Sequence, residues 1–302
     1  MISTPMLSAL RAYVRHAPGR LGKAALVERT LDRVLEQRPV TITARTRFGA
    51  VFPLTTSDLI QRYVYLFGVW EPHLTAWLCH RLRPGDTFID VGANIGYFTV
   101  LASRLVGPAG HVVAVEACPQ FHQALTQNLS ANGCGNVRSV NTAVYDTATR
   151  LTLYLEDAAN LGATTIIRPH TAQSSFAIQA RTLPQILTDT ELTQARLIKI
   201  DVEGAEGAAV RGLTPLLDRL RPDAELIIEV TPRRLAKLGH SINDILQPLL
   251  AHGFHLYRLA NDYTASSYPA ALRRPAVPTR WHQPILEMSD LVFSRIDADS
   301  LT

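Results

Sequence analysis

Two acidic residues stand at the ends of apolar stretches, and each comes directly before a turn. Asp90 ends the stretch "TFID" and is followed by "VGANIG", in which Gly92 and Gly96 flank Asn94. Glu116 ends a second stretch, "HVVAVE". Ligands of parallel sheets lie beyond the carboxyl ends of the strands, so these acids predict a ligand with cationic or hydroxyl groups.

The turn after Asp90 does not suit a dinucleotide. A dinucleotide needs G-x-G-x-x-G, which lets bare backbone approach the pyrophosphate, and the Asp90 carboxylate would repel those phosphates. S-adenosylmethionine has an ammonium and a sulfonium group and no phosphate. We expect Asp90 to receive its amino group, directly or through water, Gly92 and Gly96 to let the backbone come close, and Asn94 to reach the methionine end.

Two later positions complete the predicted cofactor site. Glu116 is placed to accept both ribose hydroxyls of the adenosine, and "VRSVNTAV" ends a third strand near Ala143, whose amide is set to meet the adenine edge. Helix capping by Asp90 and a solvated strand end at Glu116 are the simpler structural explanations. For Ala143 an ordinary structural role explains the residue equally well. The order and spacing of the three signals favour S-adenosylmethionine.

The segment "LIKIDVEGAE" carries the candidate reaction chemistry. Its strand should lie beside the Asp90 strand, so Asp201 should emerge next to the sulfonium methyl and orient an acceptor hydroxyl while taking its proton. Glu203 and Glu206 follow at the start of the next helix and are the further catalytic candidates. Acids in the first turn of a helix also have a structural explanation, because the helix dipole stabilises them.

Other residues compete for roles in the same site. The same acids could bind Mg²⁺, but no further ligand cluster is visible, so no metal is predicted. Glu229, in "ELIIEVTP", together with Arg280 and Trp281, forms a weaker set of candidates for contacts with the acceptor. Four histidines remain rival bases, although each is more typical of a surface or loop position: His170, His240, His255 and His282.

The elements that must position these residues follow a repeating strand and helix rhythm. The rhythm predicts a doubly wound, mostly parallel, seven-stranded α/β sheet with helices on both faces. The expected strands are 86–91, 111–116, 137–144, 196–201, 224–230, 254–259 and 290–295. The expected helices are 95–106, 119–132, 182–190, 205–218 and 240–252.

Three segments depart from this rhythm. Residues 1–47 are expected to form an N-terminal helical extension, and 48–302 the main domain, with 48–84 leading into it. Residues 146–181 alternate in short segments that predict an extra hairpin or meander. Residues 261–285 are rich in Pro, Ser and Ala without a period, which predicts a long loop of the functional or disordered kind.

Composition limits the expected partners of the protein and its cellular compartment. The chain has 302 residues, 47% of them hydrophobic, and a net charge of +4 with its basic residues spread out, so nucleic acid is not an expected partner. Three cysteines without metal-type spacing fit a reducing, cytoplasmic compartment. No apolar run is long enough to cross a bilayer. The first segment has no acid before Glu28 and several basic residues, so it suits either a membrane-surface helix or, as the simpler explanation, helices packed on the domain.

Three blocks of the sequence resemble a known family. "GDTFIDVGANIGYFTVLASR", "VVAVEACP" and "LIKIDVEGAEGAAVRGL" are similar to signature blocks of the FkbM family of S-adenosylmethionine-dependent methyltransferases, and "FGVWEPHLTAWL" resembles its approach segment, with Glu71. The resemblance covers about 50–231. It implies the Rossmann-like class I methyltransferase fold, cofactor contacts that include Glu71, and methylation of hydroxyl groups on sugars or polyketide-type natural products.

The resemblance has two departures. Pro184 and Gln185 follow Leu183 where the family commonly has acidic residues, and the loop at 261–285 is not shared. An O-methyltransferase acting on a small-molecule, glycan or glycolipid hydroxyl is therefore the leading hypothesis. A cofactor-binding scaffold without catalysis stays open, and a nicotinamide-dependent dehydrogenase is disfavoured by Asp90 and Asn94. The acceptor and the oligomeric state are left undetermined.

Overall fold

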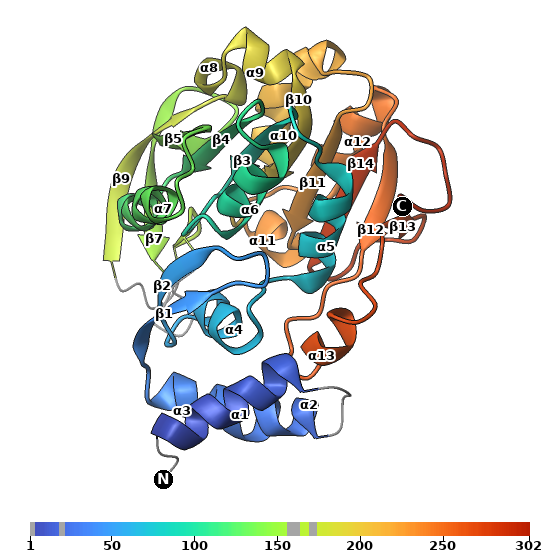
Figure 1. Cartoon of the computed structure of the whole chain (residues 1–302). Helices are drawn as coiled ribbons and strands as arrows, with labels where there is room; N and C mark the ends of the chain where they lie inside the picture. The colour runs from blue at the N-terminus through green and yellow to red at the C-terminus, as the bar shows by residue number, and fades with distance from the viewer. Residues whose placement is uncertain (1–3, 18–21, 156–163, 169–173) are drawn as a thin grey trace.

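The computed structural model describes residues 4–17, 22–155, 164–168 and 174–302. Its centre is an eight-stranded sheet in the order β13-β12-β14-β11-β10-β3-β4-β5 (Figure 1). Five strands from β5 to β11 run parallel, and β14 is antiparallel to both of its neighbours. The strands are β3 (Thr87–Val91), β4 (His111–Glu116), β5 (Val137–Asn141), β10 (Ala195–Ile200), β11 (Glu225–Val230), β12 (His255–Leu259), β13 (Thr279–Arg280) and β14 (Ser289–Ser294).

The predicted fold class is confirmed, with one additional edge strand. Six of the seven expected strands are present, the expected strand at 137–144 is divided between β5 and a second sheet, and the two-residue β13 extends the main sheet beyond β12. β3 and β10 are buried along their whole length, as expected for central strands of a parallel sheet that is covered on both faces.

Alternate residues of each strand enter two separate hydrophobic cores. Phe88 packs into the core on one face of the sheet, while its neighbour Ile89 packs into the core on the other. The first face is covered by α4 (Leu59–Phe67), α5 (Pro72–Arg81), α6 (Tyr97–Val106) and α7 (Pro119–Ala131). The second is covered by α8 (Leu183–Ile186), α9 (Asp189–Thr193), α10 (Glu206–Leu213), a 3-10 turn at Thr214–Arg219, α11 (Pro232–Lys237) and α12 (Asn243–Ala251).

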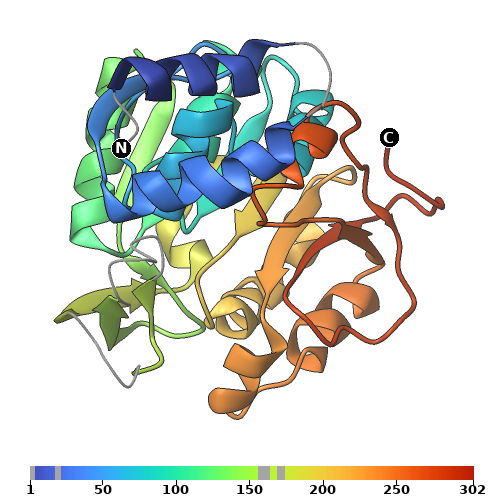
Figure 2. The ribbon, with the colours of Figure 1, turned by 90° about the horizontal axis from the view of Figure 1, so that it is seen from below.

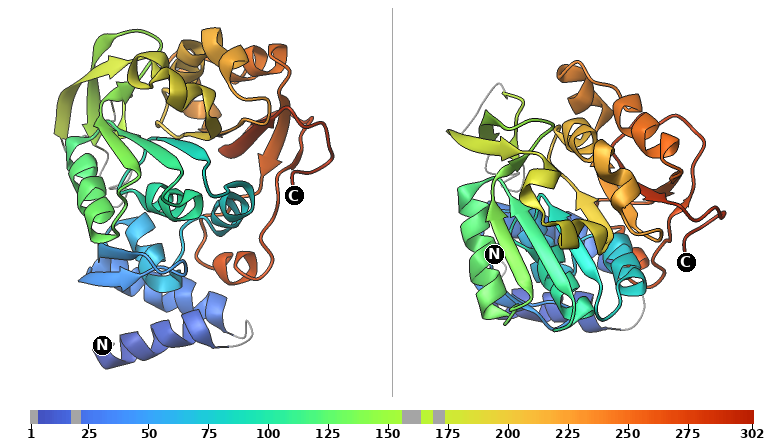
Figure 3. Two further views of the ribbon diagram at one scale, coloured as in Figure 1. Left: turned by 45° about the horizontal axis from the view of Figure 1, so that its top comes forward. Right: turned by 90° about the horizontal axis from the view of Figure 1, so that it is seen from above.

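A second, smaller sheet lies beside the β5 edge (Figure 3). It contains β6 (Ala143–Val144), β7 (Thr149–Leu155), β8 (Thr164–Thr165) and β9 (Ser174–Arg181) in the order β6-β9-β7-β8. The extra hairpin or meander expected at 146–181 is thus present as antiparallel strands, with β7 paired to both β8 and β9. The single strand expected at 137–144 is wrong, because the chain leaves the main sheet after Asn141 and joins β9 from Ala143.

Helices form most of the N-terminal segment. They are α1 (Thr4–His16), α2 (Lys23–Leu26), a π-helical turn at Val27–Leu31 and α3 (Asp32–Gln37), followed by a hairpin of β1 (Thr41–Arg45) and β2 (Val51–Thr55). Figure 2 shows α1 beside the α2 to α3 stretch. Arg11 and Arg15 donate to the carbonyl of Tyr65 in the last turn of α4, where the helix dipole favours cations. These contacts hold α1 on the domain but do not test binding to a membrane surface, so membrane contact by this segment stays a prediction.

The segment 261–285 contains more structure than predicted. It includes α13 (Tyr268–Ala271) and β13, and Tyr268 is fully buried, stacking on Phe67 at 4.7 Å between ring centroids. The Tyr63 hydroxyl donates to the Tyr263 carbonyl at 3.0 Å. Most of the segment is loop, as expected, and aromatic residues spaced without a helical or strand period anchor it on α4.

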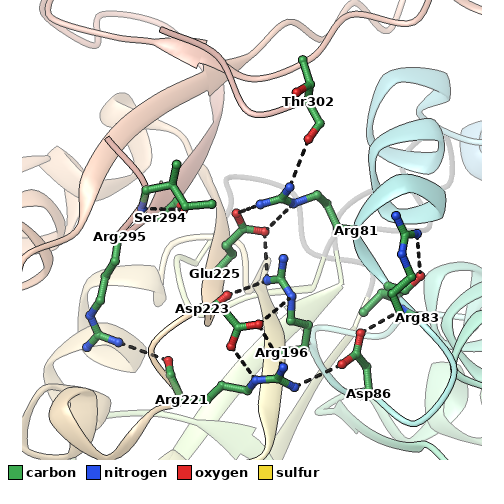
Figure 4. A network of polar contacts seen from close by, with 12 residues as sticks. Arg81, Arg83, Asp86, Arg196, Arg221, Asp223, Glu225, Ser294, Arg295 and Thr302 are labelled. Carbon is green, nitrogen blue, oxygen red and sulfur yellow. Dashed lines mark hydrogen bonds and ion pairs between the residues drawn. The ribbon is translucent and has the colours of Figure 1, made fainter. Parts of the chain in front are cut away.

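A network of charged residues holds the opposite end of the sheet together (Figure 4). Glu225, 1% exposed at the start of β11, pairs with Arg81 of α5 and with Arg196 of β10, the latter at 3.0 Å. Arg221 pairs with Asp86, just before β3, at 3.1 Å. These residues lie at the amino ends of the strands, away from the carboxyl ends where ligands bind, so we assign them to stability.

No helix in the described part of the chain is long and apolar enough to span a membrane.

Candidate active site

A cavity of about 320 Å³ opens at the carboxyl ends of β3, β4 and β10. This is the crevice that doubly wound sheets use for ligands, and its volume lies in the range of small-molecule sites. Gly92, in the turn after β3, has φ 84° and lines the cavity. A Cβ at this position would lie 1.7 Å from the Asp201 carbonyl oxygen, so the close approach of two chain segments requires glycine here.

Asp90 lies beneath the cavity, 1% exposed and outside its lining. Thr99 of α6 donates to its Oδ2 at 2.6 Å, while its Oδ1 is buried and has no partner within the described residues. Burial raises the pKa of Asp90, and the nearby Lys199 opposes that shift. A buried acceptor without a partner calls for a donor, and a water bridge to the cofactor's ammonium group fits this oxygen.

Glu116, at the end of β4, lines the cavity with a fixed orientation. Its Oε2 accepts from the Asn94 amide at 2.7 Å, and its Oε1 accepts from the Cys118 amide at 2.8 Å. Each carboxylate oxygen can accept a second hydrogen bond, so the group can still receive two ribose hydroxyls. Burial raises the pKa of Glu116 to about 7, although both amide hydrogen bonds lower it.

The rest of the turn acts differently from the prediction. Asn94 lines the cavity with φ 51°, and its Oδ1 accepts from the Ile95 amide at 2.7 Å, so the side chain holds the turn. Gly96 does not line the cavity. A Cβ at Gly96 would lie 2.5 Å from Leu125 Cδ1, so this glycine serves the packing of α6 against α7, and its predicted cofactor contact is wrong.

The predicted adenine end is lined mainly by apolar side chains. Ala143 and Val144 of β6 line it together with Leu151 and Leu153 of β7 in the small sheet. Apolar side chains with a few polar groups are typical of cofactor pockets. The chemistry of these residues fits S-adenosylmethionine, and the predicted assignment of Asp90 to its amino acid end, Glu116 to the ribose and Ala143 to the base stays a prediction.

Two ion pairs occupy the side of the cavity next to β10. Lys199 donates to Asp201 Oδ2 at 2.7 Å, and Arg234 of α11 pairs with Glu203. Burial alone lowers the pKa of Lys199, but the charges of Asp201, Asp90 and Glu71 raise it above its usual value. The ammonium group of Lys199 is therefore a permanent charge beside Asp201.

Glu206 lies outside the cavity lining and is 3% exposed. Its Oε1 accepts from the Gly204 amide at 2.9 Å, so the side chain stabilises the turn before α10. Burial raises its pKa to about 7. The helix start turns this carboxyl toward the backbone, so the structure offers no support for the predicted catalytic role of Glu206.

Three residues from distant segments meet at the other side of the cavity. The Tyr263 hydroxyl lies 2.9 Å from Glu71 Oε1 and 2.8 Å from Glu229 Oε2. The Tyr263 ring stacks on Trp70, with centroids 5.3 Å apart, and all four residues line the cavity. Burial, with Asp290 as the second cause, raises the pKa of Glu71 to about 8. Sequence reasoning missed Tyr263, although aromatic residues in a polar, aperiodic segment were a usable signal.

Several predicted residues lie elsewhere. Arg280 of β13 bonds to Asp297 at 2.7 Å and to His255 at 2.8 Å, at the sheet edge. Trp281 packs under Arg258, with 4.8 Å from the guanidinium carbon to the ring centroid. Neither lines the cavity, because β13 and the residue after it lie at the far edge of the sheet, so the structure does not support their predicted acceptor contacts. His240, His255 and His282 are likewise absent from its lining, and His170 lies outside the described residues.

The acids suited to a metal ion are a different set from the expected one. Carboxylate oxygens of Asp201, Glu203 and Glu229 lie within 4.8 Å of one another, whereas Glu206 is not part of this group. Lys199 and Arg234 already compensate two of these three charges. We therefore assign no metal ligand, and the absence of a metal requirement stays a prediction.

The strand order, the glycine turn after β3 and the acid after β4 define a class I methyltransferase, and S-adenosylmethionine is the cofactor that this family and fold imply. A model of the methyltransferase FkbM domain matches residues 90–256, more than half of the chain. The chain belongs to the FkbM methyltransferase family.

Curated relatives match a shorter stretch. A protein-L-isoaspartate O-methyltransferase of Ignicoccus hospitalis is 37% identical over 68 residues, covering 22% of this chain and 32% of that protein. An arsenite methyltransferase of Halobacterium salinarum is 36% identical over 56 residues, covering 18% and 14%. The chain thus spans about a third or less of the length of these two relatives.

Solved structures show similarity over more of the chain. A methyltransferase FkbM from Methylobacillus flagellatus KT is 15% identical, with a TM-score of 0.38 over 89% of this chain and 60% of that one. A precorrin-6y C5,15-methyltransferase from Geobacter metallireducens GS-15 is 14% identical, with a TM-score of 0.42 over 74% and 88%.

Proposed function

We propose that the protein is an S-adenosylmethionine-dependent O-methyltransferase whose acceptor is a hydroxyl of a sugar, a glycan or glycolipid, or a polyketide-type natural product. The observation that supports this most is the approach of Asp201, Glu203 and Glu229 to within 4.8 Å at the cavity wall. Carboxylates accept hydrogen bonds, so this wall suits a neutral acceptor with several hydroxyl groups.

The aromatic side of the cavity supports the same class of acceptor. Trp70 and Tyr263 stack on each other, and Phe98 lines the wall beneath Lys199, whose ammonium is 5.4 Å from the ring centroid. Flat apolar faces beside hydrogen-bond acceptors suit the two sides of a sugar ring or an oxygenated polyketide.

Methyl transfer to a hydroxyl needs the two reactants held in line with water excluded. We assign the orientation of the acceptor hydroxyl to Asp201, because Lys199 holds its Oδ2 and leaves Oδ1 for the substrate. Glu203, fixed by Arg234, is suited to bind a second hydroxyl of the acceptor. Neither role requires a metal ion.

Mass spectrometry with a deuterium-labelled methyl donor tests the function. The purified protein is incubated with panels of sugars, glycolipids and polyketides, and we expect one labelled methyl group on an oxygen of the product. Asp201→Asn should slow this transfer about 10²-fold at saturating substrates, because the acceptor hydroxyl is no longer held in line. Asp218→Asn is the matched control, because Asp218 is 82% exposed.

A comparison with Asp90→Asn separates binding from chemistry. Asp90→Asn should weaken cofactor binding by about 1.5–3 kcal/mol, the value of a hydrogen bond to a charged group, while Asp201→Asn should bind the cofactor almost normally. Methylation of nitrogen or carbon alone would contradict the proposal. Tight cofactor binding with no transfer across the panels would favour the scaffold alternative.

A further inference from the structure

We propose that Glu71, Tyr263 and Glu229 form a proton relay that takes up the proton of the acceptor hydroxyl during methyl transfer. The inference rests on the O-methyltransferase function proposed above. Glu229 contacts the acceptor and is the catalytic residue of the three, whereas Tyr263 and Glu71 act through it as positioning residues. Glu71 and Tyr263 both lie outside the residues 90–256 that match the family model.

The contacts require a shared proton. Tyr263 Oη lies 2.9 Å from Glu71 Oε1 and 2.8 Å from Glu229 Oε2, both within hydrogen-bond distance. A phenol has a single proton and an ionised carboxylate has none, so the phenol alone supplies one hydrogen bond for two contacts. A second proton, carried by one of the two carboxyl groups, accounts for the other contact, because that carboxyl group then donates to the phenol oxygen. The three groups together therefore carry one negative charge.

The surroundings support a proton on this unit. Glu71 is 3% exposed, and burial, together with neighbouring acids, raises the pKa of both carboxyl groups above the usual range. The backbone amide of Glu71 donates to the Tyr268 hydroxyl at 3.3 Å, which fixes the start of α5 against α13. Several charged or titratable groups face the unit. They are Lys199 of β10 and Asp201 just after it, Glu203 with its partner Arg234, Asp290 of β14 with Arg258 near it, and Tyr268. Asn261 donates a hydrogen bond to Asp290.

The unit lies within reach of the acceptor oxygen. Carboxylate oxygens of Glu229 and Asp201 lie within 4.8 Å, so one hydroxyl placed between them can be within about 2.7 Å of both. Asp201 is already held by Lys199, whereas Glu229 has its Oε2 on the relay and its Oε1 without a hydrogen bond to any described residue. Glu229 is therefore the carboxylate that can pass a proton onward.

The step balances without any added reactant. The acceptor oxygen forms a bond to the methyl carbon as the bond from that carbon to the cofactor sulfur breaks, and the sulfur keeps the electron pair. The acceptor O–H bond breaks and its proton goes to Glu229. If Glu229 already holds the shared proton, that proton moves to Tyr263 and the phenolic proton moves to Glu71. In both cases the unit changes from one negative charge to none.

The relay predicts distinct effects on the pH profile of kcat/KM. In the wild type, activity falls on the acid side as the unit takes a third proton, which protonates its remaining carboxylate, and can accept no more. Glu229→Gln should lower kcat about 10²–10⁴-fold and remove this acid limb. In Glu71→Gln the amide imitates a protonated Glu71, so Tyr263 donates to an ionised Glu229. We expect this variant to stay active with its acid limb at lower pH.

Tyr263→Phe separates the relay from a merely structural role. The phenylalanine keeps the stack on Trp70 but cannot carry a proton, so kcat should fall while cofactor affinity stays within about twofold. Tyr257→Phe is the matched control, because the Tyr257 hydroxyl donates to the Ile296 carbonyl at the sheet edge. The control should leave the pH profile unchanged even if stability falls.

Infrared spectroscopy of the free protein at neutral pH tests the shared proton without any acceptor. Because burial also raises the pKa of Glu116 and of Glu206 to about 7, the band of the shared proton is identified by subtracting the variant spectrum from the wild-type spectrum. Its carbonyl stretch should be lost in Glu71→Gln, shifted in Tyr263→Phe and unchanged in Tyr257→Phe. A band that does not respond to the first two substitutions would overturn the relay even if methyl transfer is confirmed. The predicted band changes in a protein that transfers no methyl group would instead contradict the proposed function. Unaltered acid limbs in both Glu71→Gln and Glu229→Gln would also overturn the relay.

Discussion

The Asn94 amide donates to Glu116 Oε2 at 2.7 Å, so the turn after β3 fixes the orientation of the acid that ends β4. Two loops that belong to different strands thus form one rigid cradle. The Cys118 amide holds the other oxygen of the same carboxylate. The cradle is therefore set before any ligand arrives, which reduces the ordering cost of binding.

The first prediction concerns this carboxylate. Glu116→Gln keeps the shape but replaces one acceptor oxygen with a donor, which loses an amide contact and a ribose hydroxyl. We expect cofactor affinity to fall by about 1.5–3 kcal/mol, measured by titration calorimetry. Glu28→Gln, on an exposed residue of the N-terminal segment, is the control. Equal affinities of the two variants would exclude Glu116 from the site.

The second prediction concerns the glycine of the cradle. Gly92→Ala places a Cβ 1.7 Å from the Asp201 carbonyl oxygen, so the strand ends must separate. Gly85→Ala is a close control, because Gly85 has φ 92° but nothing within 4 Å of its Cβ. Both variants share the cost of a left-handed backbone, about 1 kcal/mol or more. Gly92→Ala should lose further stability in urea unfolding and also lose cofactor binding, and equal losses in the two would refute the close approach.

The pattern of strand ends explains what the sequence could predict. Asp90, Glu116 and Asp201 were foreseen because a strand that is buried on both faces leaves few positions for an acid except its end. Gly96 was assigned to the wrong partner because sequence spacing does not show that Leu125 packs there. Whether Gly96 faces a cofactor or Leu125 depends on the position of α7, which is set by tertiary packing.

The contacts on the Tyr263 side of the cavity could not be predicted from the sequence, because they join segments that are far apart in the chain. Tyr263 meets Glu71 across 192 positions of the chain, and no local period signals that contact. Arg234 pairs with Glu203 from α11, a helix that the sequence pattern did not predict. Arg280 and Trp281 were expected at the cavity because a long loop suggests function, but the strand pairing of β13 places them at the edge of the sheet.

The third prediction concerns stability and pH. The folded-state pKa of Glu71, about 8, lies above its ordinary value of 4.5, so the folded protein holds this proton over a range where the unfolded chain has lost it. The resulting stabilisation is fully present below about pH 4.5 and is lost as the pH rises through 8. In urea unfolding, the wild type should lose stability relative to Glu71→Gln between pH 5 and 8, by about 1.4 kcal/mol for each unit of pKa separation. A gain over that range would contradict the assigned burial.

The fourth prediction concerns metal ions. Methyl transfer should survive treatment with a chelator, because Lys199 and Arg234 already compensate Asp201 and Glu203. Rates are measured before and after chelation and again after adding Mg²⁺. Activity that disappears with the chelator and returns with Mg²⁺ would make these acids ligands and would replace the roles proposed for them.

Cofactor identity is the central claim, and thermal unfolding with and without ligand tests it most directly. A ligand that binds the folded state alone stabilises it by about 2.7 kcal/mol at a hundred times its Kd. We predict that S-adenosylmethionine and its demethylated product raise the Tm of the wild type, that the gain is smaller in Asp90→Asn, and that NAD has no effect. A rise in Tm with NAD and none with S-adenosylmethionine would contradict the account.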